Sequence, residues 1–253
     1  MKKKVYTFYD KIDGWEEDKK LLDLWLKNWK NKDFEPIVLN SSDSKLNPYY
    51  SEFVETIQWY YKEILEKELI DKDNPWTYYV EKNFVRFLAY GNLLEDCTIM
   101  TMDYDIYNVD YSEDPRTLNE NIIFHRGDCP CLVSGTPKKI QLFCEMICSI
   151  LKDIPHEINT MFKNSGYRNY LFNDMSLMSC VRYSDNNYLK EMIKKNNIVF
   201  TDESNTILDT KLIHASNEVI QDYINNNNIT KEFTNEERTK IRLDYAQKHL
   251  LDN

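Results

Sequence analysis

The sequence predicts an α/β fold, with a mixed, mostly parallel central sheet flanked by helices. Over the first hundred residues short apolar runs alternate with helical patterns in the order β-α-β-α-α-β, which favours parallel strands wrapped by helices. Hydrophobic residues make up 42% of the chain and aromatic residues 13%, enough for a substantial core. The 253 residues fit one large domain, because no linker rich in Gly, Ser or Pro divides them.

The elements expected in the first half alternate between strands and helices. In each expected helix apolar residues recur every three or four positions, as Val80, Phe84 and Leu88 do, which is typical of a helix with one buried face. The polar stretch 40–43 is expected to be a loop. The expected strands are Lys4–Tyr9, Pro36–Leu39 and Thr98–Met102, and the expected helices are Glu16–Lys30, Ser51–Leu69 and Trp76–Tyr90.

The second half is less regular. A helix is expected to open at Thr136-Pro137, because Thr caps helices well and Pro is favoured at the first helical position. Another helix is expected to begin at Asn173-Asp174, and a polar helix to cover Thr234–Leu251. The expected strands are Ile122–His125, Cys131–Ser134, Ile198–Phe200 and Lys211–His214.

Charge and hydropathy exclude several classes of protein. The net charge of −10 argues against a nucleic-acid partner, because binding to a phosphate backbone needs a basic surface. No window approaches the ~20 apolar residues of a membrane span. The basic start of the chain has no apolar stretch behind it, so it is interpreted as a first strand rather than a signal peptide, and the expected compartment is the cytoplasm.

Two acids, Asp103 and Asp105, directly follow the expected strand Thr98–Met102. Side chains two positions apart project to the same side of an extended backbone. Carboxylate oxygens suit Mg²⁺ or Mn²⁺, which share their coordination with substrate phosphates. Ligands of open α/β sheets bind beyond the carboxyl ends of strands. The pair therefore predicts a metal–phosphate site, with an ordinary acidic strand exit as the alternative.

Other ligand motifs are missing from the sequence. Gly occurs only five times, and neither a G-x-G-x-x-G nor a G-x-x-x-x-G-K-[ST] motif is present, so a dinucleotide-binding Rossmann domain and a P-loop are not expected. The six cysteines are interpreted as reduced thiols, because the expected compartment is the cytoplasm. A zinc site is not expected, since the spacing of Cys129, Cys131, Cys144 and Cys148 fits no common zinc finger. An acidic protein can still bind a small phosphorylated ligand where a metal and a few basic residues neutralise it.

Four segments taken together resemble a known family. They are VYTFYD (5–10), FVRFLAYGN ahead of TIMTMDYD (84–105), FNDMSLMS (172–179) and LIHAS (212–216). In this order and spacing the chain resembles the GT-A fold, a Rossmann-like fold of nucleotide-sugar-dependent glycosyltransferases, and especially the small soluble enzymes of bacterial polysaccharide and large-virus glycan pathways. The resemblance implies a single domain with a nucleotide-sugar-binding half, 1–110, and an acceptor-side half, 111–253, that carries a C-terminal helix.

The resemblance also implies roles for particular residues. Asp103, Asp105 and His214 would form the metal site for Mn²⁺ or Mg²⁺, and Asp174 would be the catalytic carboxylate, although Met175 stands where the family often has Gln. The implied donor-binding residues are Thr7, Tyr9, Asp10, Asn83, Arg86, Asp103 and Tyr104, and those on the acceptor side are His125 and Asn173.

Three of these residues have a structural alternative. Arg86 either belongs to a solvated helix face or contacts the donor or braces Asp103, since its planar fork suits phosphate and carboxylate. Asp174 either only caps a helix, worth ~1 kcal/mol, or takes a proton from the acceptor. His214 is either a hydrogen-bonded structural residue or a metal ligand.

The function implied is transfer of a sugar from a nucleoside-diphosphate sugar, with a UDP-sugar as the first choice, to a hydroxyl of a glycan or glycoconjugate. One alternative is a nucleotide-sugar-binding module without catalysis. Another is a nucleotidyltransferase, which is disfavoured because FYDKIDGWEED (8–18) lacks the Gly-rich phosphate loop typical of that class. The sequence does not decide between retention and inversion.

Overall fold

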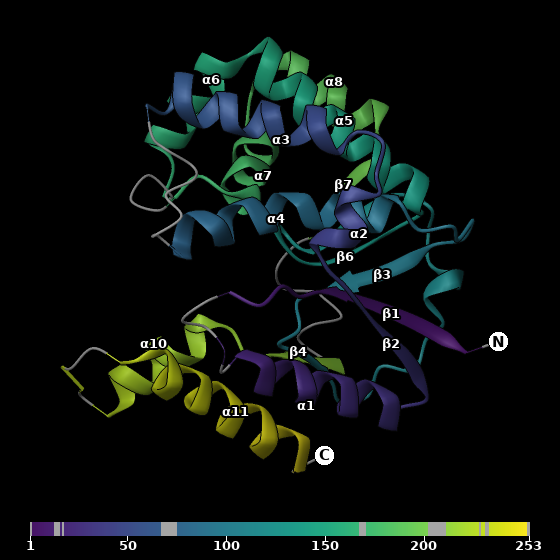
Figure 1. The fold of residues 1–253 in the computed structure, drawn as a ribbon, viewed down its shortest axis with the longest axis vertical. Coiled ribbons are helices and arrows are strands. Elements are labelled where there is room, and N and C mark those ends of the chain that lie inside the picture. The colour runs from purple at the N-terminus through teal and green to yellow at the C-terminus, as the bar shows by residue number, and fades with distance from the viewer. Residues whose placement is uncertain are drawn as a thin grey trace.

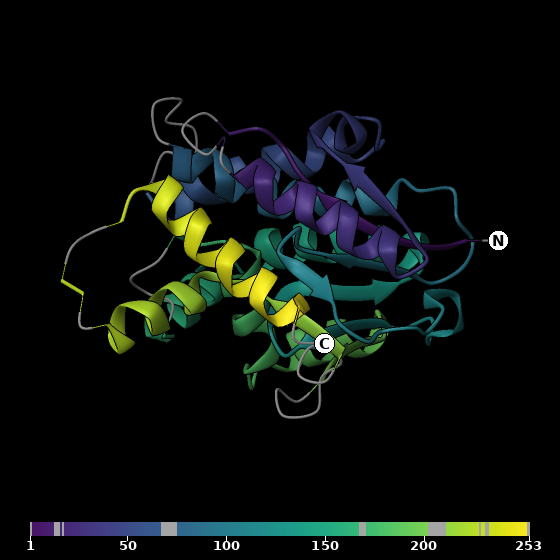
Figure 2. The same ribbon diagram turned by 90° about the horizontal axis from the view of Figure 1, so that it is seen from below.

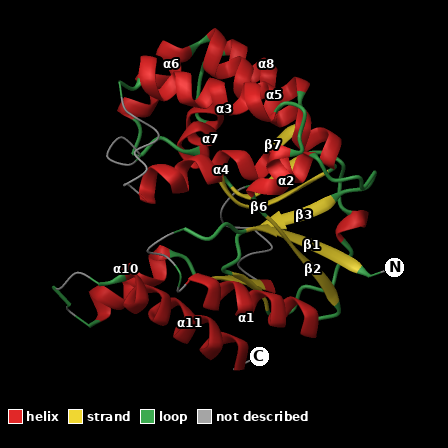
Figure 3. Ribbon diagram, viewed as in Figure 1, coloured by secondary structure: helices red, strands yellow, loops and turns green. Residues whose placement is uncertain are grey.

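The computed structural model describes residues 2–12, 16, 18–66, 75–166, 171–201, 211–227, 229–230 and 233–251. Their centre is a six-stranded, mixed and mostly parallel sheet with helices on both sides (Figures 1 and 3). The strand order is β2-β1-β3-β6-β5-β7. The strands are β1 (Lys3–Phe8), β2 (Phe34–Leu39), β3 (Ile99–Met102), β5 (Ile122–Arg126), β6 (Cys129–Gly135) and β7 (Ile198–Phe200).

The direction of the strands decides where a ligand site can form. β1 pairs in parallel with β2 and β3, and β5 pairs in parallel with β7, whereas β6 is antiparallel to both β3 and β5. Since β3 and β5 are both antiparallel to β6, they are parallel to each other. β1, β3 and β5 therefore run in one direction, and their carboxyl ends meet at one edge of the sheet. A second, two-stranded antiparallel sheet of β4 (Ile106–Asn108) and β8 (Leu212–His214) lies beside this edge.

Helices cover both faces of the central sheet (Figures 1 and 2). A separate hydrophobic core lies between the sheet and the helices on each face. One core contains the buried rings of Phe84, Phe143 and Phe172, and the other contains Trp25 and Trp29. On the first side lie α2 (Ser41–Lys45), α3 (Tyr50–Trp59), α4 (Pro75–Gly91), α5 (Pro137–Asp153), α6 (Pro155–Asn164), α7 (Asp174–Arg182) and α8 (Asn187–Lys195). On the second lie α1 (Asp18–Asn31), α10 (Asn217–Asn226) and α11 (Asn235–Leu251).

The predicted α/β class with its mixed, mostly parallel sheet is confirmed. The two expected halves share this sheet, since β3 from residues 1–110 pairs with β6 from residues 111–253. Among the described helices, none is long and apolar enough to cross a membrane.

Some local predictions are wrong. The expected loop at 40–43 is the start of α2, where Asn40 caps the helix and Asp43 closes a capping box, because the residues that favour loops also favour helix starts. The expected helix Ser51–Leu69 is α3 followed by a π-helical turn at Tyr60–Ile64, and residues 67–69 lie outside the described part of the chain.

Candidate functional site

A cavity of about 600 Å³ opens at the carboxyl ends of β1 and β3. Residues just after these strands line it, together with one face of α4, the turn between β5 and β6, the end of β8 and the first part of α11. The convergence of strand ends explains why polar side chains gather here, as expected for ligand sites of open α/β sheets.

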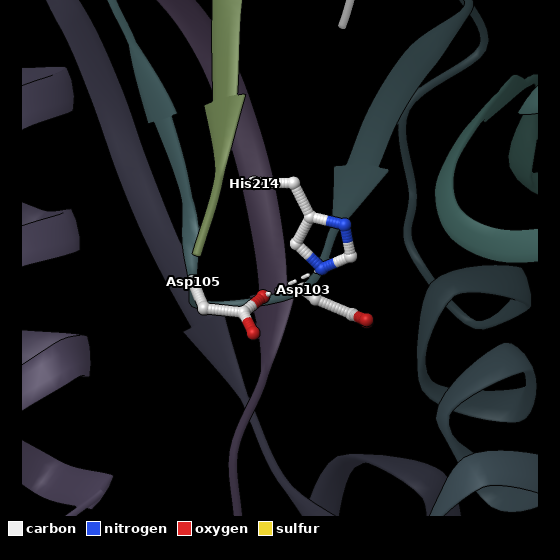
Figure 4. Close-up of side chains that lie close together, drawn as sticks. All are labelled: Asp103, Asp105 and His214. Atoms are coloured by element: carbon white, nitrogen blue, oxygen red, sulfur yellow. Dashed lines mark ion pairs between the residues drawn. The ribbon is translucent and has the colours of Figure 1, made fainter. Parts of the chain in front are cut away.

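Asp103, Asp105 and His214 lie together at the wall of this cavity. Each offers one ligand atom, and these atoms lie within 4.8 Å of one another (Figure 4). The small sheet brings His214 in, because the register of β4 and β8 pairs Ile106 with His214 and the backbone N–H of Ala215 donates to the Asp105 carbonyl at 2.9 Å. The structure therefore unites the three residues that the sequence predicted as metal ligands.

A guanidinium group holds one oxygen of each acid. Arg86 Nη1 donates to Asp103 Oδ1 at 2.5 Å, and Arg242 Nη2 donates to Asp105 Oδ2. The other oxygen of Asp105, Oδ1, is buried, lies 3.3 Å from His214 Nε2 and has no partner in hydrogen-bond geometry among the described residues. Each carboxylate is thus fixed by one oxygen, and Asp105 keeps a buried oxygen for another ligand.

Burial and neighbouring charge shift the pKa values of these groups in different directions. Burial raises the pKa of Asp103 to about 6, against the opposing charge of Arg86. Burial acts the same way on Asp105, but the interactions with His214 and Arg242 outweigh it and lower its pKa to about 2. Burial alone would lower the pKa of His214, yet the Asp105 charge raises it. Asp105 therefore stays ionised to a lower pH than Asp103.

Arg86 is not part of a solvated helix face. It is buried on α4, and besides Asp103 it contacts Asp174 Oδ2 at 2.6 Å and the Pro130 carbonyl oxygen at 3.2 Å. The contacts of Arg86 match a role in bracing Asp103, rather than a place on a solvated helix face.

The position of Asp174 differs from its expected role as a catalytic carboxylate. Its side chain is only 5% exposed and does not line the cavity. Oδ2 accepts from Arg86, and Oδ1 accepts from the backbone N–H of Met175 at 2.9 Å. With both oxygens occupied and buried, this carboxylate is placed to fix Arg86 rather than to meet an acceptor hydroxyl. Asn173, not Asp174, is the helix cap, because its side chain accepts from the Ser176 N–H.

The expected donor-binding residues are divided. Tyr9, Asn83 and Tyr104 line the cavity, and the Tyr9 and Tyr104 rings meet edge to face with centroids 5.3 Å apart. Asp10 also lines it, but both its oxygens are engaged, Oδ1 by the Ser41 N–H at 3.1 Å and Oδ2 by the Ser41 hydroxyl and by Lys82 at 3.2 Å. The Asp10 carboxylate therefore ties β1 to α2 and α4.

Besides Asp174, three predicted residues do not line the cavity, namely Thr7, His125 and Asn173. Thr7 is fully buried within β1, one position too early in the strand to reach the cavity. His125 is buried in β5 with Nε2 2.8 Å from the Ser134 hydroxyl, and burial lowers its pKa to about 4. The expected acceptor-side role of His125 and Asn173 is thus not matched by their placement.

Sequence reasoning missed Arg126, Asp18, Thr239 and Arg242, all of which line the cavity. Arg126 follows the expected strand Ile122–His125, so the same strand-end rule that selected Asp103 could have selected it. Asp18 accepts from the Tyr104 hydroxyl at 2.8 Å and from the Thr239 hydroxyl at 3.0 Å, which docks α11 on α1. Nothing in the polar sequence of α11 marks Thr239 or Arg242 as residues that face a site.

The three candidate metal ligands, Asp103, Asp105 and His214, fit a hard divalent cation. Two ligand atoms on one ion lie at most about 4.6 Å apart, twice a metal–ligand distance of about 2.3 Å, so a spread of 4.8 Å needs only a small side-chain adjustment. The buried Asp105 Oδ1 without a hydrogen bond is a natural ligand atom. Two carboxylates and an imidazole suit Mn²⁺ or Mg²⁺ better than a thiophilic ion.

The lining of the cavity has a slight excess of acid. Six carboxylates and five lysine and arginine side chains line the cavity. These basic side chains alone do not neutralise a bound diphosphate as well, so a divalent cation could supply the missing positive charge. The acids are Asp10, Asp18, Asp103, Asp105, Asp128 and Glu218, and the bases are Lys82, Arg86, Arg126, Arg238 and Arg242.

Comparison with protein-family models, with curated proteins and with solved structures found no match for this chain.

Proposed function

We propose that this protein is a metal-dependent glycosyltransferase, which moves a sugar from a nucleoside-diphosphate sugar to a hydroxyl of a glycan or glycoconjugate. The observation that carries the proposal is the cluster of Asp103, Asp105 and His214 within 4.8 Å in a cavity at the strand ends. The resemblance of the four sequence segments to GT-A glycosyltransferases supports it, and a UDP-sugar is the first donor to test.

In this reaction the acceptor oxygen bonds to the anomeric carbon, the bond from that carbon to the diphosphate oxygen breaks, and the diphosphate leaves with the electron pair. The acceptor hydroxyl gives up its proton. Mn²⁺ or Mg²⁺, held by Asp103, Asp105 and His214, would supply the positive charge that the leaving diphosphate needs. Arg86 and Arg242 hold the two carboxylates in the orientation that such binding requires.

The remaining lining residues have roles that follow from their chemistry. Tyr9 and Tyr104 offer aromatic surface to a nucleobase, and the Asn83 amide can both donate to and accept from a ribose or sugar hydroxyl. Asp174 is assigned the task of positioning Arg86, because its oxygens are occupied and buried. The closeness of the three metal ligands favours this function over a binding module that has lost its metal site.

A thermal-shift screen of nucleoside diphosphates and nucleotide-sugars, with and without Mn²⁺, tests the proposal. A ligand at about 100 times its Kd stabilises the fold by about 2.7 kcal/mol, which for a chain of this size raises Tm by roughly 5–10 °C. We expect such a shift only when Mn²⁺ is present, and release of the free nucleoside diphosphate when an acceptor is added. If none of the nucleotides or nucleotide-sugars raises Tm with Mn²⁺ present, the proposal is wrong.

The variant Asp105→Asn makes the test specific to the site. It keeps the shape of the side chain but removes the charge of a metal ligand, so we expect Mn²⁺-dependent nucleotide affinity to fall by ~100-fold or more. Asp110→Asn is the matched control, because Asp110 is exposed just after β4 and outside the cavity.

A further inference from the structure

Arg126 ends β5 at the same sheet edge as Asp103. A two-residue turn, Gly127-Asp128, follows and leads into β6. Gly127 has a positive φ of 58°, which a glycine adopts without strain at the first central position of such a turn. The turn therefore places Arg126 at the cavity wall, in contact with His214.

The guanidinium of Arg126 has two partners of different strength. Nη1 lies 2.7 Å from His214 Nδ1, and Nη2 donates to Glu218 Oε2 at 2.7 Å. The Glu218 side chain is 74% exposed, so this ion pair is weak. The contact with His214, whose side chain is only 13% exposed, is the better shielded of the two. By contrast, Arg86 and Arg242 are each committed to a buried carboxylate of the site.

The contact between Arg126 and His214 is incompatible with a cation on His214. A guanidinium can only donate, so His214 Nδ1 must accept, and the hydrogen of the neutral ring then sits on Nε2, which faces Asp105. When Nε2 ligates a cation instead, the ring hydrogen moves to Nδ1. Two donors would then face each other, and Arg126 would lose its hydrogen bond to His214, keeping only the exposed Glu218.

We infer that Arg126 is a phosphate-binding residue that His214 retains until a divalent cation occupies the site. The inference rests on the proposed function, and it deepens it by naming the residue that meets the diphosphate. Binding of the cation at His214 releases the guanidinium from the imidazole, and its planar fork at the cavity wall can then exchange the exposed Glu218 for phosphate oxygens bound in a bidentate manner. Cation binding and phosphate binding are then coupled through one arginine.

The experiment compares wild type with Arg126→Met by isothermal titration calorimetry, using Mn²⁺ alone and then inorganic pyrophosphate at saturating Mn²⁺. Met fills similar space but donates nothing. We expect Arg126→Met to bind Mn²⁺ about 2- to 10-fold more tightly, because a competing hydrogen bond is gone. We expect it to bind pyrophosphate ~10- to 100-fold more weakly, because charged hydrogen bonds to phosphate are lost.

Two controls keep the result interpretable. Arg116→Met removes an arginine that pairs with Asp114 outside the cavity, and should leave both affinities unchanged. Arg126→Lys keeps the charge without the fork, and should give an intermediate pyrophosphate affinity if Arg126→Met fails to fold.

The outcomes separate this inference from the proposed function. If wild type binds Mn²⁺ and pyrophosphate but Arg126→Met binds pyrophosphate equally well, the inference alone is wrong. Weaker Mn²⁺ binding in Arg126→Met would also overturn it, since Arg126 would then support His214 rather than compete with the cation. If wild type shows no Mn²⁺-dependent pyrophosphate binding, both the inference and the proposed function are wrong.

Discussion

Arg242 donates a hydrogen bond to Asp105 from a position 137 residues further along the chain. The same side chain donates from Nε to the Ala215 carbonyl oxygen at 2.7 Å and lies 3.7 Å from Asp18 Oδ1. One arginine on α11 thus ties together the acid after β3, the end of β8 and the start of α1. The helix α11 is a wall of the candidate site.

Arg242→Met tests this relationship. Removing the guanidinium leaves the buried Asp105 carboxylate without its main partner, so we expect the free energy of unfolding to fall by about 3 kcal/mol. Urea denaturation measures the change. Lys240→Met is the control on the same helix, because Lys240 is exposed and its loss should alter stability by no more than about 0.5 kcal/mol. Equal stability of Arg242→Met and wild type would contradict the role of Arg242.

Asp174→Asn separates positioning from proton transfer. Asn keeps the shape but removes the charge that faces buried Arg86, so we expect a loss of about 3 kcal/mol of stability, accompanied by reduced activity. Asp185→Asn, at a fully exposed position, is the matched control and should change neither. A variant of normal Tm whose turnover falls by ~100-fold would instead identify Asp174 as a general base.

Tyr9→Ala tests the nucleoside end of the cavity. Stacking of a base on an aromatic ring is worth about 1–3 kcal/mol, so we expect nucleoside-diphosphate affinity to fall by ~5- to 150-fold while Mn²⁺ affinity is unchanged. Calorimetric titrations of Mn²⁺ alone and of UDP at saturating Mn²⁺ measure the two affinities separately. Tyr183→Ala, at an exposed position that does not line the cavity, is the control. An unaltered UDP affinity in Tyr9→Ala would show that the base lies elsewhere.

The buried His125 should make the free energy of unfolding depend on pH. Burial lowers its pKa to about 4, whereas an unfolded histidine has a pKa of about 6.5. The unfolded state therefore binds more protons below pH 6.5, so stability is lost as the pH falls toward 4. Between pH 7 and pH 5 this histidine alone should cost about 2 kcal/mol. Urea denaturation of wild type and His125→Gln over this range measures the effect, and parallel stability curves would refute it.

The sequence was sufficient for the parts of the fold that local pattern controls. The α/β class and the strand ahead of Asp103 followed from apolar runs of regular period. The three-residue strand β4 was missed, because it pairs only with β8, a partner far along the chain that no local pattern reveals.

The site could be predicted only where a rule links sequence position to sheet edge. Asp103 and Asp105 follow a strand, and such residues lie at an edge whatever the details of packing. The burial of Asp174 could not be foreseen, since it depends on how α7 packs beside α4 and places Arg86 between two acids. Arg242 was missed for the same kind of reason, because tertiary docking of α11 alone brings it to Asp105.

The separation of Asp105 and Arg242 also has a consequence for synthesis of the chain. At about 5–20 residues per second, Arg242 leaves the ribosome on the order of ten seconds after Asp105. Throughout that interval the acid lacks the arginine that orients it, and α11 does not yet close the cavity. A nascent chain therefore completes the candidate site only when α11 docks, and a product truncated before α11 would carry the acids without this wall of the cavity.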